Sequence, residues 1–580
     1  MIPNPRQGGE EALVRGQTEA LIEIQRLSDL SAIRYVGHTV VDDDLAVGIE
    51  LATCSFEKSD GGLPVQERER LVVLVSANYP HVPPDVYVDH DRWLNQPHVL
   101  QGHRLCLYLD PPAEWDPTEG VRGLFRRLWD WFADATAQRY NPSTALYHPV
   151  GGVLHRTPGS PTIVLHLPLG DTSTFTTQKI LLRSRRPHRI DVEALSLPPH
   201  GPAEDQFRGL LVALSDVVPR GAGMRLSDLC NTIRGQDSRS ERKRFLGALS
   251  KVAQTLRGDE HLVVLIAVPN RQVALEESSQ LIAFRLPQHQ VDDAVRAATY
   301  ASTDPDALTD EPVLEWLYVD DNRRARTIRR DSSRPINWFT ERRIELWGCG
   351  ALGSWIAEHV VRAGASQLTL RDPGYVSSGL LVRQNFTQQD VGLSKVEALA
   401  RRLGDLSDCV DINPRRGFAQ QGLDPDRAPI DLIIDCTVST AVTVALDAHQ
   451  ASGRLAIPVV QVATDQETAS LGLVTVTDGS SSTTTNSLDK GLYEMVAGDA
   501  DLAAYGGFWN ASTVPPLVPT AGCSVPTFRG SGADVSVVAA TAISLAVTAL
   551  GRRVSAGYLF AAPHAPFDIP PRVSHHPASG

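Results

Sequence analysis

Cysteine is scarce in this sequence and is not grouped. The 580 residues include seven cysteines, an odd number spread along the chain, and no two of them form a CxxC pair. An odd, scattered set is poor material for a disulfide framework, so we expect a reducing compartment, the cytoplasm. The missing CxxC pairs also predict that the chain binds no structural zinc.

Signals for membranes and for nucleic acids are equally sparse. The first 16 residues lack a charged segment followed by an apolar one and do not resemble a secretory signal. The longest apolar run, Val535–Leu550, is interrupted by serines and threonines and is short for a bilayer, so we expect a buried helix and no membrane partner. The formal charge of −13 argues against a nucleic-acid partner, because phosphate binding relies on clustered basic groups. With 42% apolar residues, the composition indicates a soluble protein of several domains.

The densest positive signal begins at a glycine-rich turn. A β-like run, Ile344–Trp347, leads into Gly348, Gly350 and Gly353 and then into a helix-like stretch. In such a strand-to-helix turn, backbone N–H groups face a phosphate. Asp372 ends the next predicted strand, 19 residues beyond Gly353, where a ribose hydroxyl would lie. This much fits any dinucleotide-binding fold.

Three charged residues further along the same half-sheet change that interpretation. Arg383, Lys395 and Asp435 supply two cations and a carboxylate. Two cations and a carboxylate suit a triphosphate and a divalent metal better than a pyrophosphate. The set therefore favours ATP and Mg²⁺ as the ligands of this region.

Together these motifs resemble the ThiF/MoeB/ubiquitin-activating adenylyltransferase superfamily over about residues 325–550. The resemblance implies a Rossmann-like adenylation domain that acts as a homodimer. It implies that the three glycines hold ATP, that Asp372 binds ribose, that Arg383 and Lys395 contact the phosphates, and that Asp435 holds magnesium. Joining a carboxylate to the α-phosphate of ATP brings two anions together, so the reaction needs fixed positive charge and a metal ion.

Some positions depart from the family pattern. Leu380 stands where the family has Asn in a pattern such as SNLxRQ, and Gly374 replaces a second strand-end acid. Gln384 and Asn385 are candidates for the lost amide contacts. The family also places an arginine upstream, often acting across a dimer, and the run Asn322–Arg324 offers Arg323 or Arg324 for that role.

A second pattern occupies the start of the chain. It consists of NYPHVPPDV at 78–86, QPHVLQGHRLCL at 96–107, EWDP at 114–117 and an amphipathic stretch at 121–132. The pattern resembles the ubiquitin-conjugating fold over about residues 10–150. The resemblance implies that Cys106 is a nucleophile supported by Trp115 and Pro117, and that His98 replaces the oxyanion-stabilising Asn of the family.

A cysteine attacks as its thiolate, and a free thiol with a pKa of about 8.5 is only partly ionised near neutrality. His98, His103 and Arg104 are the candidates for promoting ionisation of Cys106. The alternative is that Cys106 is an ordinary half-buried thiol in an extended segment.

A further candidate nucleophile is Cys523, in the loop PTAGCSVPTFRG at 519–530. Small neighbours leave its thiol accessible, and Arg529 favours the charged form. Activating enzymes of the thioester-forming branch have a cysteine downstream of the magnesium-binding Asp, so the resemblance makes Cys523 the thioester cysteine. The alternative is a buried small residue. Cys349 and Cys436 lie inside the nucleotide motifs and are expected to be packing residues.

The whole chain is predicted to be an α/β and α+β protein of three domains. We expect a ubiquitin-conjugating-like α+β domain at 1–155, an α/β linker domain at 156–324 and a Rossmann-like ThiF adenylation and thioester domain at 325–580. In the linker domain the patterns predict strands at 163–169, 180–183 and 261–268, with helices near 205–218 and 240–256. This domain has no chemical motif and is either a spacer or a dock for a substrate protein.

Activating-like and conjugating-like modules on one chain predict a relay. ATP adenylates the C-terminus of a protein, Cys523 forms a thioester, and Cys106 receives the acyl group before an amine of a target protein does. The order of modules resembles bacterial fusion proteins of antiphage cyclic-oligonucleotide (CBASS) operons, which implies that the activated protein is a nucleotide cyclase or a ubiquitin-like protein. Two rivals stay open: an adenylyltransferase of ThiF/MoeB type that activates a sulfur carrier, and a non-catalytic assembly scaffold.

Overall fold

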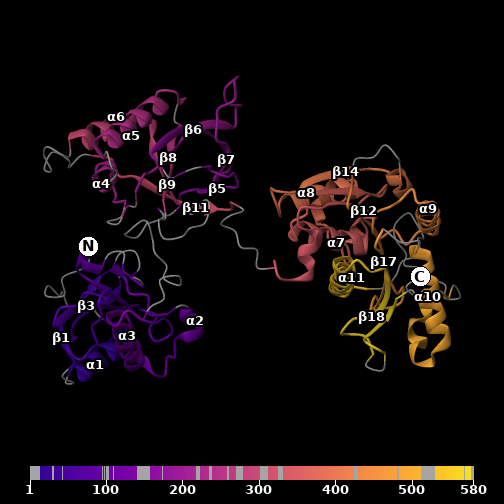
Figure 1. The fold of residues 1–580 in the computed structure, drawn as a ribbon, viewed down its shortest axis with the longest axis horizontal. Helices are drawn as coiled ribbons and strands as arrows, with labels where there is room; N and C mark the ends of the chain where they lie inside the picture. The colour runs from indigo at the N-terminus through magenta and orange to yellow at the C-terminus, as the bar shows by residue number, and fades with distance from the viewer. Residues whose placement is uncertain are drawn as a thin grey trace. The chain divides into compact units, whose positions relative to one another are not determined.

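The computed structural model divides into two compact units, residues 1–328 and 329–580. Figure 1 follows the chain from indigo at the N-terminus to yellow at the C-terminus. The residues that the structure describes are 13–28, 32–41, 43–93, 96, 98–99, 103–108, 110–139, 157, 159–170, 172, 174–216, 218, 222–233, 238–257, 260–269, 279–300, 311–323, 331–423, 429–479, 483–510, 530–566 and 569–576. The boundaries of the three predicted domains stay predictions.

The N-terminal part of the first unit is an antiparallel sheet that shares one core with two helices. Its elements are α1 (Arg15–Leu27), β1 (Ile33–Val41), β2 (Asp44–Ala52), β3 (Arg68–Val75), β4 (Asp85–Val88), the 3-10 turn η1 (Asp91–Trp93), α2 (Pro111–Glu114) and α3 (Gly120–Thr136). The strands pair in the order β1–β2–β3–β4. Ile24 of α1, Val73 of β3 and Phe132 of α3 belong to the same buried cluster. The predicted order, a helix followed by a sheet, is confirmed (Figure 1).

The rest of the first unit is a closed barrel of seven strands in the order β10–β11–β5–β7–β6–β8–β9. Its elements are β5 (Thr162–Leu165), β6 (Thr176–Arg186), β7 (Arg189–Ala194), β8 (Gln206–Ala213), α4 (Leu226–Thr232), α5 (Ser238–Ala253), β9 (His261–Val268), β10 (Gln280–Pro287), α6 (Gln288–Tyr300) and β11 (Glu315–Asp321). The helices share one apolar cluster with one face of the barrel strands, and alternate residues of the same strands form a second cluster on the other face.

One prediction in this region is wrong. The segment at 205–218 was expected to be helical, but it contains the strand β8, which pairs with β6 on one side and β9 on the other. Residues 209–213 of this strand are all buried. A short, continuous apolar run has no alternation to mark it as a strand, so its pattern is the same as that of a buried helix.

The second unit is built on an eight-stranded sheet with the order β14–β13–β12–β15–β16–β17–β18–β19. Its elements are η4 (Pro335–Phe339), β12 (Arg343–Trp347), α7 (Ala351–Arg362), β13 (Gln367–Arg371), η5 (Ser378–Leu380), η6 (Gln388–Asp390), α8 (Lys395–Gly404), β14 (Asp411–Arg415), η7 (Ala419–Leu423), β15 (Leu432–Asp435), α9 (Thr440–Ala451), β16 (Val459–Thr464), β17 (Leu471–Thr477), α10 (Thr485–Gly498), η8 (Ala500–Phe508), α11 (Gly532–Arg552), β18 (Ala556–Ala561) and β19 (Arg572–His575).

Both faces of this sheet are covered, because adjacent strand residues enter different cores. Leu346 and Ile434 pack with α7, α8 and α11, whereas Trp347 and Ile433 pack with α9. The strands from β14 to β16 are parallel, and β17 to β19 continue the sheet in antiparallel pairing. Successive connections from β12 lead to β13 on one side and later to β15 on the other, which creates a switch point above β12. Ligands bind at such points in open α/β sheets.

The predicted apolar helix of the C-terminal region is α11, which lies against α7 and β17 (Figure 1). Among the described residues it is the helix whose length and composition would suffice to cross a membrane. Nine of its residues, including Val538 and Ala542, are buried in this unit. The helix therefore forms the centre of one side of the domain.

Candidate functional site

The glycine-rich turn closes tightly between β12 and α7. Gly348 has a φ of +82°, and a Cβ placed there would lie 2.9 Å from the carbonyl carbon of Cys436. A Cβ at Gly353 would lie 1.8 Å from the carbonyl oxygen of Gly348. Only glycine therefore fits these two positions, and their role is close packing of strand, turn and helix.

Gly350 differs from its neighbours because it faces open space. It is the N-cap of α7, and the nearest described atom to a Cβ there would be Nε2 of Gln384, 4.0 Å away. The N-terminus of a 12-residue helix carries partial positive charge and free N–H groups. The turn thus leaves room for an anion at Gly350 while the other two glycines hold its shape.

Asp372 is anchored to this turn by its carboxylate. One oxygen accepts the backbone N–H of Cys349 at 2.7 Å, and the other accepts that of Gly374 at 2.6 Å. The side chain is 8% exposed. Each carboxylate oxygen can accept a second hydrogen bond, so Asp372 both fixes the turn and keeps acceptor capacity for a ribose hydroxyl.

Lys395 begins α8 and lies beside the same carboxylate. A Cβ on Gly374 would be 2.9 Å from the Asp372 Oδ1 atom and 3.4 Å from the Lys395 ammonium nitrogen. Gly374, which replaces an acid of the family pattern, is thus required by close approach of these groups. Ser394, the N-cap residue of α8, has a buried hydroxyl oxygen for which the described residues supply no hydrogen-bond partner.

Arg383 belongs to a segment that packs on the first turns of α7. Its carbonyl oxygen accepts the indole N–H of Trp355 at 3.1 Å, and burial lowers the pKa of its guanidinium. Asn385 binds Glu358 through its side-chain amide at 2.7 Å and so has a structural role. Gln384 is the residue of the two that points toward Gly350, and its buried Oε1 finds no partner among the described residues.

Asp435 ends β15, next to the glycine-rich turn, and is 2% exposed. One carboxylate oxygen accepts the backbone N–H of Thr437 at 3.0 Å and its hydroxyl at 2.7 Å. The other accepts the amide of Gln461 at 2.9 Å, and Gln461 also donates to Thr443. Burial raises the pKa of Asp435 despite these hydrogen bonds, so a nearby cation would favour its ionised form.

A cavity of about 340 Å³ opens beside Asp435. Strands β16 and β17, helices α9 and α10 and the 3-10 helix η8 supply most of its lining. The sequence motifs did not indicate Gln461, Thr475 or Asp489, which line this cavity. No local spacing signals them, because they come from separate elements that only the folded sheet brings together.

The residues around the turn fit a nucleoside triphosphate. They provide an open cradle at Gly350, acceptor capacity at Asp372, an ammonium group at Lys395 and unsatisfied buried polar atoms at Gln384 and Ser394. Among the described residues no three His, Cys, Asp or Glu side chains gather to hold a metal. Magnesium is commonly held by one or two carboxylates together with substrate phosphates, and Asp435 fits that mode.

The candidate thiol of the N-terminal domain, Cys106, is half-buried in an extended segment. Its backbone N–H donates to the carbonyl of His98 at 2.8 Å, and its sulfur lies 3.7 Å from the carbonyl oxygen of Tyr108. Burial raises its pKa; Arg104 and Arg127 oppose the shift. The cysteine is thus protonated near neutral pH in this state.

The residues that affect ionisation of Cys106 are only partly those predicted from the sequence. Arg104 is the strongest influence favouring the thiolate, but it is paired with Asp85 at 3.3 Å. Burial lowers the pKa of His98, which keeps its ring neutral. Arg127 was not foreseen: it stacks over Tyr108 at 4.6 Å.

Arg127 also donates to the carbonyl of Leu107 and pairs with Glu114, so α3 holds the segment that follows Cys106. Trp115 supports the same region, with its indole N–H donating to the Pro80 carbonyl at 2.6 Å. Pro117 is exposed and makes no comparable contact in the described structure.

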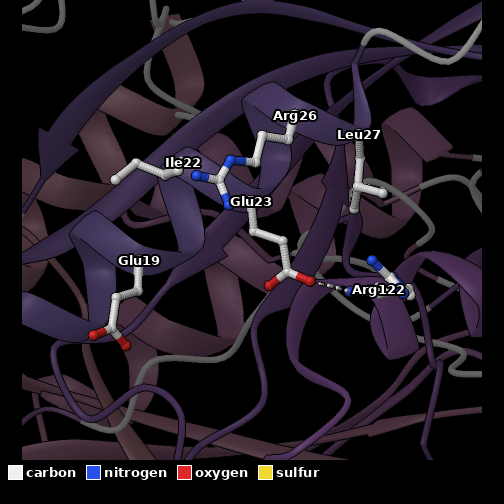
Figure 2. Close-up of a pocket in the computed structure, with 6 residues that line it drawn as sticks. All are labelled: Glu19, Ile22, Glu23, Arg26, Leu27 and Arg122. Atoms are coloured by element: carbon white, nitrogen blue, oxygen red, sulfur yellow. Dashed lines mark hydrogen bonds between the residues drawn. The ribbon is translucent and has the colours of Figure 1, made fainter.

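A hollow on the same domain lies where α1 passes the start of α3 (Figure 2). Its lining consists of Glu19, Ile22, Glu23, Arg26, Leu27 and Arg122. Figure 2 shows Glu23 reaching across to Arg122, and its carboxylate accepts the backbone N–H groups of Val121 and Arg122, each at 3.2 Å. Because these N–H groups belong to the first turn of α3, Glu23 is a helix cap from a neighbouring helix.

Arg323, one of the two arginines considered for action across a dimer, is 0% exposed and is bound by Asp321 at 2.7 Å and by the carbonyl of Ser279 at 3.0 Å. These contacts hold its side chain within the barrel. Arg324, the other candidate, lies outside the described residues. Cys523 and its loop lie outside the described residues.

Comparison with known proteins assigns two regions. Residues 332–551 match the ThiF family, and residues 17–160 match prokaryotic E2 family A. Over 122 residues the chain is 30% identical to ubiquitin-like modifier-activating enzyme 5 of Drosophila willistoni, a match that covers 19% of this chain and 30% of that protein. The chain therefore spans less than a third of the length of this relative.

Several solved structures match parts of the chain with low TM-scores. PaaA is 15% identical with a TM-score of 0.29, covering 42% of this chain and 66% of PaaA. The E. coli tRNA N6-threonylcarbamoyladenosine dehydratase TcdA is 17% identical with a TM-score of 0.27, covering 38% and 90%. E. coli MccB with ATP is 10% identical with a TM-score of 0.29, covering 60% and 81%.

Proposed function

Because this chain joins an N-terminal domain of prokaryotic E2 family A to a C-terminal ThiF-family domain, we propose that it activates the C-terminus of a protein with ATP and conjugates it to an amine. The observation that carries the proposal is the grouping of Asp372, Lys395 and Asp435 around the glycine-rich turn, on the same chain as Cys106. The two family matches separate these groups into an activating and a transferring part.

The first step is adenylation. A carboxylate oxygen of the donor protein bonds to the α-phosphorus of ATP, the bond to the bridging oxygen breaks, and pyrophosphate leaves. Lys395 and Arg383 supply positive charge for the phosphates, and the N-terminus of α7 supplies N–H donors at Gly350. Asp435 would hold Mg²⁺, which neutralises charge on the departing pyrophosphate.

The later steps move the acyl group between sulfur atoms. The Cys523 thiolate bonds to the acyl carbon and AMP leaves; the Cys106 thiolate then takes the acyl group and Cys523 is released as a thiolate. An amine of the target finally displaces Cys106 and loses a proton to solvent. Each exchange replaces one thioester by another of similar free energy, so ATP is needed only for the first step. A single chain also keeps the two thiols at high effective concentration.

The biological setting is part of the proposal. The donor is proposed to be the nucleotide cyclase of a CBASS antiphage operon, and the support is the order of the two modules. A cytoplasmic location is supported by the odd number and scattered placement of the seven cysteines along the sequence. Homodimerisation is supported by the behaviour that the ThiF resemblance implies.

The experiment is a nonreducing gel with ATP, Mg²⁺ and candidate donors: nucleotide cyclases of CBASS operons and small ubiquitin-fold proteins. We expect two dithiothreitol-sensitive adducts in the wild type, one in Cys106→Ala and none in Cys523→Ala. Cys54→Ala and Cys409→Ala are matched controls, because both thiols are exposed and lie outside the proposed sites. A single adduct that does not depend on Cys106 would favour the sulfur-carrier rival, and no adduct in the wild type would favour a scaffold.

A further inference from the structure

The cavity beside Asp435 has a charge that the adenylation chemistry leaves unexplained. Its described lining consists of Asp435, Val438, Ser439, Thr440, Thr443, Gln461, Val462, Ala463, Leu473, Thr475, Asn486, Asp489, Phe508 and Trp509. This set holds two carboxylates and no Lys, Arg or His. Asp435 is placed for a metal ion, whereas Asp489 on α10 has no cation among these residues.

Asp489 is held in position but not neutralised. One of its oxygens accepts the indole N–H of Trp509 at 3.1 Å. Burial raises the pKa of this half-buried carboxyl, which is the expected response to a charge without a partner. A ligand cation at this place would favour the ionised form.

A second polar group in the cavity is also unsatisfied. Thr475, on β17, is 1% exposed, and its hydroxyl oxygen has no hydrogen-bond partner among the described residues. A buried hydroxyl without a partner costs free energy, so a polar ligand that reaches the cavity would recover a hydrogen bond there. This observation is independent of the charge at Asp489.

The aromatic side of the cavity suits a flat or aliphatic cation. Phe508 and Trp509 are half-buried, with ring centroids 6.0 Å apart, and Tyr493 packs on Trp509 at 5.8 Å. Ring faces attract ammonium and guanidinium groups, and the attraction grows when water is excluded. A carboxylate beside two aromatic rings is therefore a recognition site for Lys or Arg.

We propose that this cavity binds the C-terminal tail of the donor protein and selects a basic side chain close to the terminal carboxylate, with Asp489 as its ion-pair partner. The inference rests on the proposed function: with Mg²⁺ and the ATP phosphates at Asp435, the reacting carboxylate of the donor would lie at that end of the cavity. A volume of about 340 Å³ accommodates a few terminal residues and not a folded domain. Asp489 is thus a specificity residue and not a catalytic one.

The test uses N-terminally fluorescent pentapeptides with a free C-terminus, carrying Arg, Lys, citrulline or Glu in turn at each of the positions before the last. Citrulline has nearly the shape of Arg without its charge. Fluorescence anisotropy with the full chain is expected to show at least about tenfold tighter binding for Arg than for citrulline at one position. Asp489→Asn keeps an acceptor for Trp509 and is expected to reduce that ratio to about one.

Two further variants sharpen the result. Asp489→Arg is expected to reverse the preference toward Glu peptides. Asp501→Asn removes an exposed carboxylate of η8 that does not line the cavity, and it should keep the preference for Arg. The inference is overturned if Arg and citrulline peptides bind equally, if Asp489→Asn leaves their ratio unchanged, or if no peptide binds at millimolar concentration. Pyrophosphate exchange with an intact donor would still succeed in those cases, so the proposed function is tested separately.

Discussion

Two glycines of the glycine-rich turn should respond differently to substitution by alanine: one variant should lose stability and the other should lose nucleotide affinity. Gly353→Ala puts a methyl group 1.8 Å from the Gly348 carbonyl oxygen, so β12 and α7 must move apart, and overpacking of this kind costs about 3 kcal/mol. Gly350→Ala meets no described atom closer than 4.0 Å. Its cost to folding is limited to the poor capping of Ala, about 1 kcal/mol. If ATP phosphate lies against Gly350, however, the methyl group occupies that space and should weaken ATP binding at least about tenfold.

The assay has two readouts on the full chain. Hydrogen exchange of amides in β12 and α7 reports the local free energy of opening, and calorimetry with a non-hydrolysable ATP analogue reports affinity. We expect Gly353→Ala to lose much more protection than Gly350→Ala, and Gly350→Ala to lose affinity for the nucleotide analogue. Unchanged nucleotide affinity in Gly350→Ala would refute the placement of phosphate at the start of α7, and equal loss of protection in both variants would refute the packing argument.

Three other variants test individual charges. Burial raises the folded-state pKa of Asp435, so the stability contributed by its protonated form is lost as pH rises. Asp435→Asn should therefore raise the melting temperature by about 2–4 °C near neutral pH, and this gain should shrink toward pH ~4. The same variant should lose adenylation. Arg104→Gln should slow alkylation of Cys106 by iodoacetamide at least about twofold near pH ~8, because Arg104 is the strongest influence favouring the thiolate. Equal alkylation rates in the variant and the wild type, measured by peptide mass spectrometry, would contradict this. Glu23→Ala should destabilise the N-terminal domain by about 1–2 kcal/mol in thermal melts, because the cap of α3 is lost. Glu19→Ala, the control, should leave the melting temperature unchanged. Equal melting temperatures in the two variants would contradict a capping role for Glu23.

The glycine-rich turn and the acids at the strand ends could be predicted because these residues occupy short, local patterns. Gly348, Gly350 and Gly353 mark one strand-to-helix turn, and Asp372 and Asp435 follow or end two parallel strands. The carboxyl ends of parallel strands meet at one edge of a sheet, so spacing along the sequence translates directly into proximity. The ThiF-like and conjugating-like domains predicted from such patterns are confirmed by the family matches.

Features that depend on distant elements could not be predicted. Thr475 and Asp489 meet Asp435 only because β17 and α10 are added to the sheet after the parallel strands, and no motif spans that distance. Arg127 is one of several basic residues on an amphipathic helix, and only the packing of α3 places it over Tyr108. The continuous apolar run of β8 likewise predicts a helix wrongly, because both faces of the strand are buried and no alternation marks it.

The central claim is that a protein carboxyl terminus is activated as an adenylate in the ThiF-family domain. The most direct measurement is exchange of labelled pyrophosphate into ATP in the presence of a donor, with the same donor amidated at its C-terminus as control. The account predicts exchange with the free carboxylate, none with the amide, and loss of exchange in Lys395→Ala. Exchange with the amidated donor, or no exchange with any nucleotide cyclase or ubiquitin-fold protein offered, would contradict it.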